Sequence, residues 1–260
     1  MLKLNSFYIG ESVEWMQNNM EDNFVDLTVT SPPYDDLRKY NGFKFDYKSM
    51  LKELYRITKD GGVVVWVVGD KTHNGSETGT SFNHALHAKE IGFNLHDTMI
   101  YLKNVCPFPE VNRYYQGFEY MFIFTKGKLK TFNSIKDREN KSAGRLVTGT
   151  QREKDGTTSK KICLGNEIKK YGVRFNYWLV SDGKRQNKHP AVFPEQLAKD
   201  HIISWSNEED IVFDPMCGSG TTCKMAWLNN RKFIGVDMSE EYINDICMPR
   251  LKKHGWGNTY

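Results

Sequence analysis

The sequence has few cysteines, and their spacing indicates no structural role. Its five cysteines, in 260 residues, include no Cys-x-x-Cys pair and no spacing typical of a zinc site. An odd number of cysteines without such a framework argues against a disulfide-stabilised extracellular domain and favours reduced thiols in the cytosol. The seven histidines form no His-Glu-x-x-His motif, so we predict no metal site.

Long hydrophobic runs are also absent. The amino terminus, MLKLNSFYIGES, lacks the apolar stretch of a signal peptide. The longest apolar run is VVVWVV, at residues 63–68, which is far shorter than the roughly 20 residues that span a bilayer. We therefore expect a soluble, cytoplasmic protein with no membrane partner.

Hydrophobic residues make up 39% of the chain and aromatic residues 13%, which is enough for a sizeable core. The length predicts one large domain, or one domain with an inserted module. Short apolar runs predict strands at residues 4–9, 26–30, 62–69, 93–103, 119–126, 210–214 and 232–237. Amphipathic stretches predict helices at residues 12–19, 47–59, 81–91, 194–205, 221–230 and 239–254. This alternation predicts an α/β fold with a doubly wound, mostly parallel, seven-stranded sheet.

The positive charge of the chain is concentrated in residues 126–188. This segment holds 17 Lys and Arg against 6 Asp and Glu, a net charge of +11, while the rest of the chain has a net charge of −7. Periodicity fades here, and REKDGTTSKK, at residues 152–161, is interpreted as a loop. Such asymmetry is typical of polyanion binding, although a solvated loop region would have the same composition.

The stretch VDLTVTSPPY predicts a buried strand that stops abruptly at Ser31, Pro32, Pro33 and Tyr34. Prolines cannot donate to a strand ladder and hold their carbonyl groups rigid. A planar base could stack on Tyr34 while the Ser31 hydroxyl and the Pro32 carbonyl accept hydrogen bonds from its exocyclic amino group. That would expose the nitrogen lone pair for attack. The alternative is a simple proline turn.

A second motif lies in DIVFDPMCGSGTTCKMAWLNNRKFIGVD. A strand ends in Asp214 and Pro215, a glycine turn follows, a helix opens at Thr221, and the next strand ends in the acid Asp237. This series is typical of a nucleoside site at the carboxyl edge of a parallel sheet, with the acid placed to accept from the ribose hydroxyls. It is not a Walker loop, and Cys223 stands where a dinucleotide fingerprint has its third glycine. The alternative is a helix start beside a surface aspartate.

Together, TSPPY, DPMCGSGTT and KHPAVFPEQL resemble the catalytic, cofactor-binding and linking motifs of S-adenosylmethionine-dependent DNA methyltransferases that modify exocyclic amino groups. Their order resembles the circularly permuted β-class, and the resemblance extends from Ser6 to Leu251 except for the insert. It implies a Rossmann-like fold, S-adenosylmethionine as cofactor and double-stranded DNA as partner. It also implies a catalytic half at 1–125, a basic target-recognition insert at 126–188 and a cofactor-binding half at 189–260.

The resemblance also implies roles for individual residues. Catalysis would fall to Ser31, Pro32, Pro33 and Tyr34. Cofactor contacts in the glycine turn would come from Asp214, Pro215, Cys217, Gly218, Ser219, Gly220 and Thr221. Asp237 would hold the ribose, and Glu11, where the family usually has aspartate, would approach the adenine. His189, Pro190 and Phe193 would lie over the cofactor, although a histidine with a purely structural role is an alternative for His189.

A target base inside a duplex must be flipped out before a residue at a strand tip can reach it. Two loops have the aromatic and basic mixture that could clamp the strand, and their candidates are Arg38, Lys39, Arg113, Tyr114 and Tyr115. Lys160 and Lys161 of the insert are candidates for phosphate contacts.

We therefore expect a site-specific DNA methyltransferase acting on N4 of cytosine, the subgroup that the Ser-Pro-Pro-Tyr spelling most resembles. N6 of adenine is the alternative acceptor; an RNA or protein-glutamine methyltransferase and an inactive DNA-binding module are further alternatives. Cys106 precedes Pro107, the reverse of the Pro-Cys nucleophile used for carbon-5 methylation. A bacterial or phage-like, nucleoid-associated enzyme is expected. The sequence leaves open the recognition site, a cognate restriction endonuclease and a homodimer.

Overall fold

The computed structural model describes residues 2–33, 45–103, 112–180 and 194–257. The chain divides into two compact units. The larger comprises residues 1–133 and 176–260, and the smaller comprises Ser134–Phe175. The smaller unit lies within the basic segment that the charge distribution singled out at 126–188, whereas residues on both sides of it belong to the larger unit.

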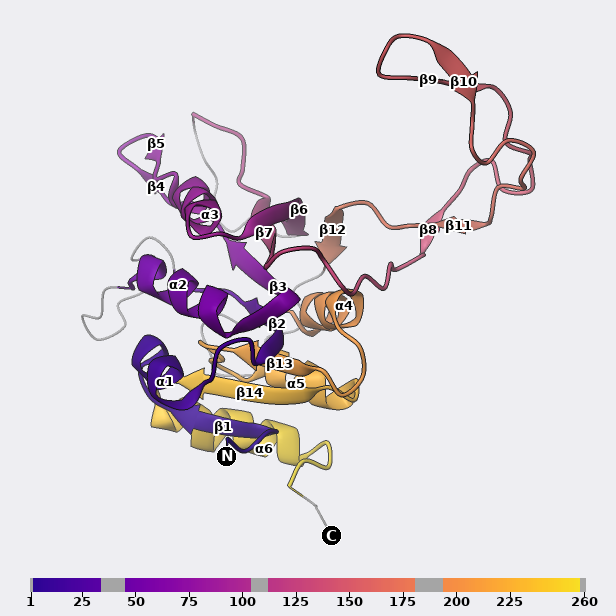
Figure 1. Ribbon diagram of the computed structural model, residues 1–260. Coiled ribbons are helices and arrows are strands. Elements are labelled where there is room, and N and C mark those ends of the chain that lie inside the picture. The colour runs from indigo at the N-terminus through magenta and orange to yellow at the C-terminus, as the bar shows by residue number, and fades with distance from the viewer. Residues whose placement is uncertain (1, 34–44, 104–111, 181–193, 258–260) are drawn as a thin grey trace. The chain divides into compact units, whose positions relative to one another are not determined.

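The larger unit contains a sheet of eight strands, one more than expected (Figure 1). They are β1 (Ser6–Ile9), β2 (Val25–Thr30), β3 (Thr58–Val68), β6 (Asn94–Lys103), β7 (Phe118–Thr125), β12 (Tyr177–Val180), β13 (Ile211–Asp214) and β14 (Lys232–Asp237). The added strand, β12, pairs in parallel with β6 along the edge of the sheet. Only alternate residues of YWLV are buried in β12, so this four-residue strand gives a weak signal in the sequence.

The strand order is β1-β14-β13-β2-β3-β7-β6-β12. Only β7 runs antiparallel to its neighbours among these eight strands. The expected α/β fold with a mostly parallel sheet is therefore confirmed. Because β1 pairs with β14, the first strand of the sheet lies beside the last strand along the chain.

Helices cover both faces of this sheet. They are α1 (Ser12–Asn19), α2 (Tyr47–Ile57), α3 (Thr80–Glu90), α4 (Glu195–Trp205), α5 (Thr221–Leu228), a π-helical turn η1 (Tyr242–Cys247) and α6 (Met248–Lys252). All six expected helices are present, but the last is split between η1 and α6. Pro249 follows the π-helical turn, and proline has no N–H to continue a regular ladder.

The central strand β3 shows why its sequence is continuously apolar. Val63, Val65 and Val67 belong to the core beneath α4 and α5, together with Leu197 and Ala226. The alternate residues of the strand, Val64, Trp66 and Val68, belong to a second core that includes side chains of α1, α2 and α3. A strand buried on both faces needs apolar residues at every position, not at every second one.

The parallel strands bring their carboxyl ends to one edge of the sheet. Thr30 of β2, Asp214 of β13 and Asp237 of β14 are the last residues of three adjacent strands. We call this the carboxyl edge and the opposite one the amino edge. The loops after parallel strands carry the ligand sites of open α/β sheets.

The smaller unit, Ser134–Phe175, is called the ribbon below. It contains β8 (Arg138–Glu139), β9 (Thr150–Arg152), β10 (Thr158–Lys160) and β11 (Tyr171–Gly172), paired antiparallel as β8 with β11 and β9 with β10. The interpretation of residues 152–161 as a loop was wrong in part: Arg152 and Thr158–Lys160 belong to strands β9 and β10, and residues 153–157 form the turn that connects them. The Asp155-Gly156 pair, a common hairpin turn, was the sequence signal for it.

Two further short strands, β4 (Thr72–His73) and β5 (Ser76–Glu77), form a small hairpin after β3. Where the chain leaves the larger unit, the Asn133 side chain donates to the Ser206 carbonyl at 3.0 Å. Where it returns, Asn176 donates to Asp97 at 3.1 Å. None of the helices in the described ranges has both the length and the apolar character needed to cross a lipid bilayer.

Candidate functional site

The carboxyl edge joins the ends of four strands through direct hydrogen bonds. The Thr30 hydroxyl donates to Asp214 Oδ1 at 2.9 Å, which ties the end of β2 to the end of β13. The backbone N–H of Gly10, after β1, donates to the Asp237 carbonyl of β14 at 3.0 Å. Ser31 follows Thr30 directly, so the expected catalytic tip begins beside the glycine turn that follows β13.

The glycine turn needs glycine at two positions. Gly218 has φ +50° and Gly220 has φ +73°, a region that favours glycine. A Cβ atom on Gly220 would also lie 3.0 Å from the Cys247 sulfur, so the turn is closely packed from below. The Cys217 N–H donates to the Val236 carbonyl at 2.9 Å, which fixes the turn against β14. The result is a rigid backbone turn leading into α5 at Thr221.

Asp237 is bound to this turn but keeps capacity for a ligand. Its Oδ2 accepts from the Gly218 N–H at 2.8 Å and its Oδ1 from the Ser239 N–H at 2.9 Å. A carboxylate offers about four acceptor positions, so about two are left. The side chain is half-buried, and no cation pairs with it among the residues the structure describes. Hydroxyl groups are suitable donors for such a carboxylate.

Asp214 lies deeper. It is 5% exposed, and its Oδ1 accepts from the Thr30 hydroxyl and, at 3.2 Å, from the Met216 N–H. Burial raises its pKa to about 7, although the hydrogen bonds from Thr30 and Met216 lower it. The geometry therefore shows Asp214 positioning the end of β2, while a direct cofactor contact stays a prediction.

Three cysteines lie below the turn. Cys217, Cys223 and Cys247 are buried, and the Cys247 thiol donates to the Gly218 carbonyl at 3.1 Å. Burial raises the pKa of Cys217 and Cys223, so these thiols stay neutral and act as packing groups. Because the Cys217 side chain is 5% exposed, a cofactor contact at this position would come from its backbone.

Helix α1 is fixed to the same turn. The Glu11 carboxylate caps the helix by accepting from the Glu14 N–H at 2.8 Å, and the Ser12 hydroxyl donates to the Pro215 carbonyl. The cap accounts for the acid at position 11 without a ligand. The predicted adenine contact of Glu11 is not tested by this geometry.

A charged network holds the turn from outside. The Arg250 guanidinium donates to the Ser219 carbonyl and to the Thr221 hydroxyl, each at 2.9 Å, and pairs with Glu195 at the start of α4. Lys224 pairs with the same Glu195 oxygen at 2.8 Å. This network has no signature in the sequence, because its members lie on three helices and share no motif.

Two other residues of this edge were missed. Thr30 stands directly before the expected tip, and its position there was the available signal. Asp70 follows β3. Its carboxylate accepts from the Ser81 N–H at 2.9 Å and from the Ser81 hydroxyl, so Asp70 holds the first turn of α3. The Gly69-Asp70 pair after a buried strand marked this position in the sequence.

Several predicted residues fall outside the described ranges. These are Tyr34, Arg38, Lys39, His189, Pro190 and Phe193. Of the other tip residues, Pro32 is buried while Ser31 and Pro33 are half-buried.

The predicted DNA contacts that the structure describes are placed as follows. Arg113 donates to the Thr72 hydroxyl at 3.0 Å and to the Gly75 carbonyl at 2.9 Å, so it attaches its loop to the β4–β5 hairpin. Tyr114, beside it, is 99% exposed. Lys160 ends β10 and is exposed, and Lys161 follows it half-buried.

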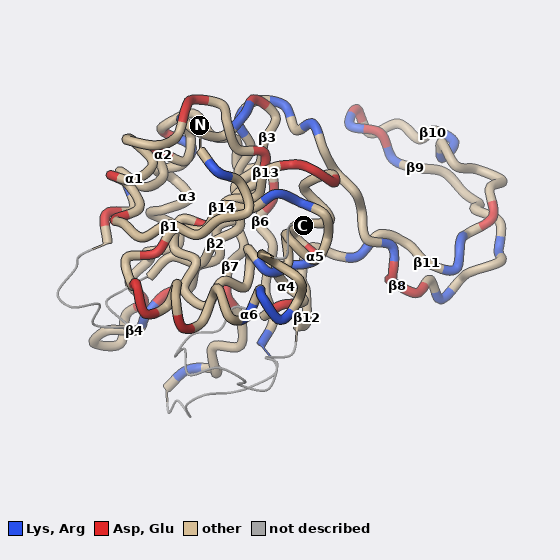
Figure 2. Tube along the Cα trace, turned by 90° about the horizontal axis from the view of Figure 1, so that it is seen from below, with Lys and Arg blue, Asp and Glu red and all other residues tan. Residues whose placement is uncertain are grey.

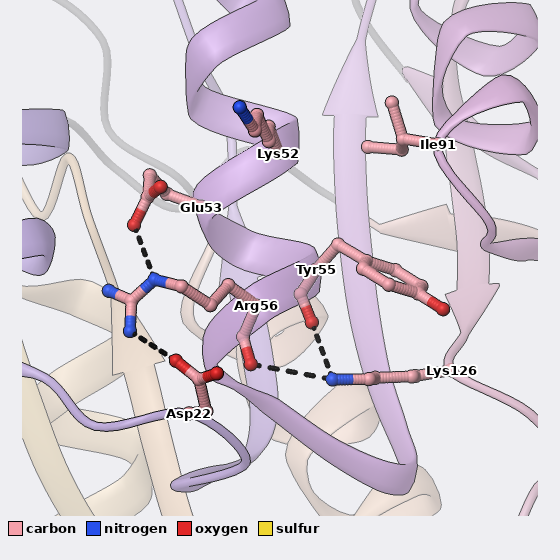
Figure 3. Close-up of a pocket in the computed structure, with 7 residues that line it drawn as sticks. All are labelled: Asp22, Lys52, Glu53, Tyr55, Arg56, Ile91 and Lys126. Carbon is pink, nitrogen blue, oxygen red and sulfur yellow. Dashed lines mark hydrogen bonds and ion pairs between the residues drawn. The ribbon is translucent and has the colours of Figure 1, made fainter.

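A hollow of about 530 Å³ lies at the amino edge, between the end of α2 and the end of β7 (Figure 3). Its charged groups other than Lys52 are paired. Arg56 binds Asp22 and Glu53, each at 2.8 Å, and the Lys126 ammonium donates to Asn23 at 2.8 Å and to the Tyr55 carbonyl at 2.9 Å. These contacts explain the charges as structural bonds, and we assign this hollow no ligand.

Comparisons with known proteins identify the family of the chain. The DNA methylase family profile matches residues 25–248. The orphan methyltransferase M.BamHII of Bacillus amyloliquefaciens is 58% identical over 248 residues, which cover 92% of this chain and 93% of that protein. The type II methyltransferase M.HpaI of Haemophilus parainfluenzae is 28% identical over 245 residues, or 90% of this chain and 70% of that protein.

Solved structures share the fold at lower identity. The PvuII DNA methyltransferase (cytosine-N4-specific) superposes with a TM-score of 0.68 at 20% identity, over 95% of this chain and 90% of that one. The M1.HpyAVI–SAM complex superposes with a TM-score of 0.62 at 20% identity, over 95% and 98%. The chain belongs to the DNA methylase family and is an S-adenosylmethionine-dependent DNA amino-methyltransferase.

Proposed function

We propose that this enzyme methylates N4 of cytosine in DNA. The observation that carries the proposal is a serine, Ser31, at the first position of the proline tip, where β2 ends against the glycine turn. The PvuII enzyme, whose fold the chain shares, is cytosine-N4-specific. Fold alone does not choose between cytosine and adenine, so the proposal rests on the Ser31-Pro32-Pro33-Tyr34 spelling.

The residues of the carboxyl edge fit S-adenosylmethionine. The glycine turn leads into the N-terminus of α5 and is half-buried at Gly218, and Asp237 has free acceptor positions for ribose hydroxyls. We propose that Pro215, Gly218 and Gly220 hold the methionine part of the cofactor. The bound cofactor supplies an electrophilic methyl group on a positively charged sulfur.

Ser31 and Pro32 would prepare the acceptor nitrogen. An exocyclic amino group conjugated with its ring is a weak nucleophile, because its lone pair is delocalised. The Ser31 hydroxyl and the Pro32 carbonyl would each accept one of its N–H bonds, which favours a tetrahedral nitrogen with an exposed lone pair. The Thr30–Asp214 hydrogen bond fixes the end of β2, so these acceptors need not rearrange during the reaction.

The remaining roles concern the DNA. Tyr34 would stack on the flipped base, and Arg38 and Lys39 would contact the strand. Arg113, with two bonds to the β4–β5 hairpin, would position the exposed ring of Tyr114. Aromatic stacking on an unpaired base is worth about 1–3 kcal/mol.

Two measurements test the proposal. After reaction with unmethylated DNA and labelled cofactor, mass spectrometry of the nucleosides should find N4-methylcytosine; N6-methyladenine in its place would contradict the choice of base. Ser31→Ala should lower kcat by about 10²-fold with little change in KM, since its hydrogen bond strengthens in the transition state. A Ser31→Ala enzyme with normal kcat would reduce Ser31 to a turn residue.

A further inference from the structure

The ribbon is one long antiparallel hairpin. Beyond the β8–β11 pair, the Asn140 N–H donates to the Lys170 carbonyl at 2.9 Å, and the Val147 N–H donates to the Asn166 carbonyl at 2.9 Å. The β9–β10 pair continues the ribbon to its tip. The chain therefore runs outward along one strand and returns along the other.

Side chains stiffen the base of the ribbon. Arg174 Nε donates to the two Asp137 oxygens at 3.1 and 3.0 Å, and this bond lowers the pKa of Asp137. Arg138 donates to the Val173 carbonyl at 2.9 Å, and its guanidinium lies 4.7 Å from the centre of the Phe175 ring. Arginines that are held in this way are unavailable for DNA.

The tip is an ordered turn. The Glu153 N–H donates to the Thr157 carbonyl at 2.8 Å, which closes a connection of three residues. The Asp155 carboxylate accepts from the Thr157 N–H at 2.9 Å, and Gly156 has φ +88°. The turn thus fixes the register of β9 against β10.

That register gives the tip two different faces. One face, called the inner-bonded face below, is formed by Gln151, Glu153 and Ser159. Gln151 lies opposite Ser159, and both side chains donate to the Glu153 carboxylate, Gln151 at 3.0 Å. These groups bind one another, and their carboxylate would repel a phosphate.

The other face, called the open face below, consists of Thr150, Arg152, Thr158 and Lys160. Arg152 lies opposite Thr158, and Thr150 lies opposite Lys160. All four are exposed. Within the described ranges, no hydrogen bond or ion pair engages the side chains of Arg152 and Lys160. Two cations and two hydroxyl groups are therefore available on one surface.

We propose that the β9–β10 hairpin enters the major groove of the DNA substrate with its open face toward the bases. The major groove is about 12 Å wide and admits a two-stranded ribbon, whose strands lie about 4.8 Å apart. The ribbon carries 11 Lys and Arg against 5 Asp and Glu, distributed along both strands (Figure 2), and this charge is complementary to the phosphates. The proposal requires the DNA methyltransferase activity but not a particular acceptor base.

Arg152 and Thr158 are the base readers in this arrangement. They are the cross-strand pair of the open face nearest the tip, so they reach deepest into the groove. Arginine binds guanine through O6 and N7, and threonine can bond a base edge or contact the methyl group of thymine. Lys160 lies two residues farther from the tip than Thr158 on the same strand, closer to the phosphates at the groove margin.

The test compares sites as well as variants. Sequencing of DNA methylated by the wild-type enzyme first defines its recognition site. For each enzyme, kcat/KM is then measured on that site and on sites with one base pair replaced, and the first value is divided by the second to give a specificity ratio. Arg152→Ala should reduce this ratio by about 5- to 150-fold at one guanine position. Lys160→Ala should weaken the binding of all DNA sites alike. It should also reduce, by about 1, the slope of the logarithm of the DNA association constant against the logarithm of the salt concentration.

Two controls isolate the contact. Glu153→Gln, on the inner-bonded face, should leave the ratio unchanged. DNA carrying 7-deazaguanine, which lacks the N7 acceptor, should reproduce the Arg152→Ala effect at that position and add nothing to it in the variant. Cofactor binding by calorimetry should match wild type in every variant, which shows that each has folded.

Equal losses on all sites for Arg152→Ala and Thr158→Val would overturn the proposal, because the hairpin would then contact phosphates alone. Unchanged ratios in all open-face variants would overturn it as well. Neither outcome depends on the methylated base, which is measured separately by mass spectrometry.

Discussion

Charged side chains lie at both edges of the sheet, but their partners differ between the two edges. At the amino edge, Arg56 binds two carboxylates; burial lowers its pKa, but Asp22 and Glu53 raise it by more. At the carboxyl edge, Asp214 and Asp237 accept hydrogen bonds from hydroxyl and N–H groups, without a cation among the described residues. The ion pairs of the hollow explain its charges as structural bonds, whereas Asp237 at the carboxyl edge keeps acceptor positions that a ligand can use.

The largest expected effect separates the two edges by pH. A raised pKa means that folded Asp214 holds a proton that the unfolded chain has lost. Its contribution to the free energy of unfolding is therefore complete below about pH 4 and is lost as the pH rises toward about 7, with a slope of at most about 1.4 kcal/mol per pH unit. Asp214→Asn should remove this slope, as measured by urea unfolding between pH 4.5 and 8 in steps of about 0.5.

Asp22→Asn is the matched control at the amino edge. Its side chain is 69% exposed and paired with Arg56, so its variant should keep the wild-type slope. The difference between each variant and wild type isolates the one carboxylate from all other titrating groups. If the free energies of unfolding of wild type and Asp214→Asn changed with pH in the same way, the pKa of Asp214 would not be raised. That result would contradict the proposed difference between the two edges.

A smaller effect is expected at the amino edge. Arg56→Met leaves Glu53, which is 6% exposed, without its cation, and leaves the carbonyls of Met16 and Met20 without their donor. We expect a loss of about 2 kcal/mol in the free energy of unfolding. KM for cofactor and for DNA should not change. A selective rise in either KM, with stability intact, would make this hollow a ligand site.

Sequence alone reached most of the sheet and the polar ends of its strands. The alternation of apolar runs with amphipathic stretches predicted the fold, and the proline tip and the glycine turn were found because each has a distinctive local sequence. Asp237 was found because it is the acidic residue that ends an apolar strand, and the end of such a strand can be located in the sequence. These signals are local, so they can be read without knowing the tertiary structure.

Features that depend on distant contacts were missed. β12 exists because β6 offers it a partner, and its four residues do not mark a strand by themselves. Arg250 reaches Ser219 and Glu195 from the last helix, so only the folded chain brings the three together. The β9–β10 hairpin has a local signal, its Asp155-Gly156 turn, but the basic composition around that turn is equally typical of a solvated loop.

The smallest expected effect concerns Asp237 and sharpens the contrast between a bonded carboxylate and an available one. Asp237→Ala should weaken S-adenosylmethionine binding by about 1.5 kcal/mol, the scale of a hydrogen bond to a charged group, as measured by calorimetry. Asp22→Ala should leave the affinity unchanged. Because Asp237 also holds the Gly218 N–H, the loss could arise from a loosened turn. A cofactor analogue without ribose hydroxyls separates the causes. If Asp237 binds the ribose, wild type and Asp237→Ala should bind the analogue equally; if it only holds the turn, the variant should lose the same affinity for both ligands.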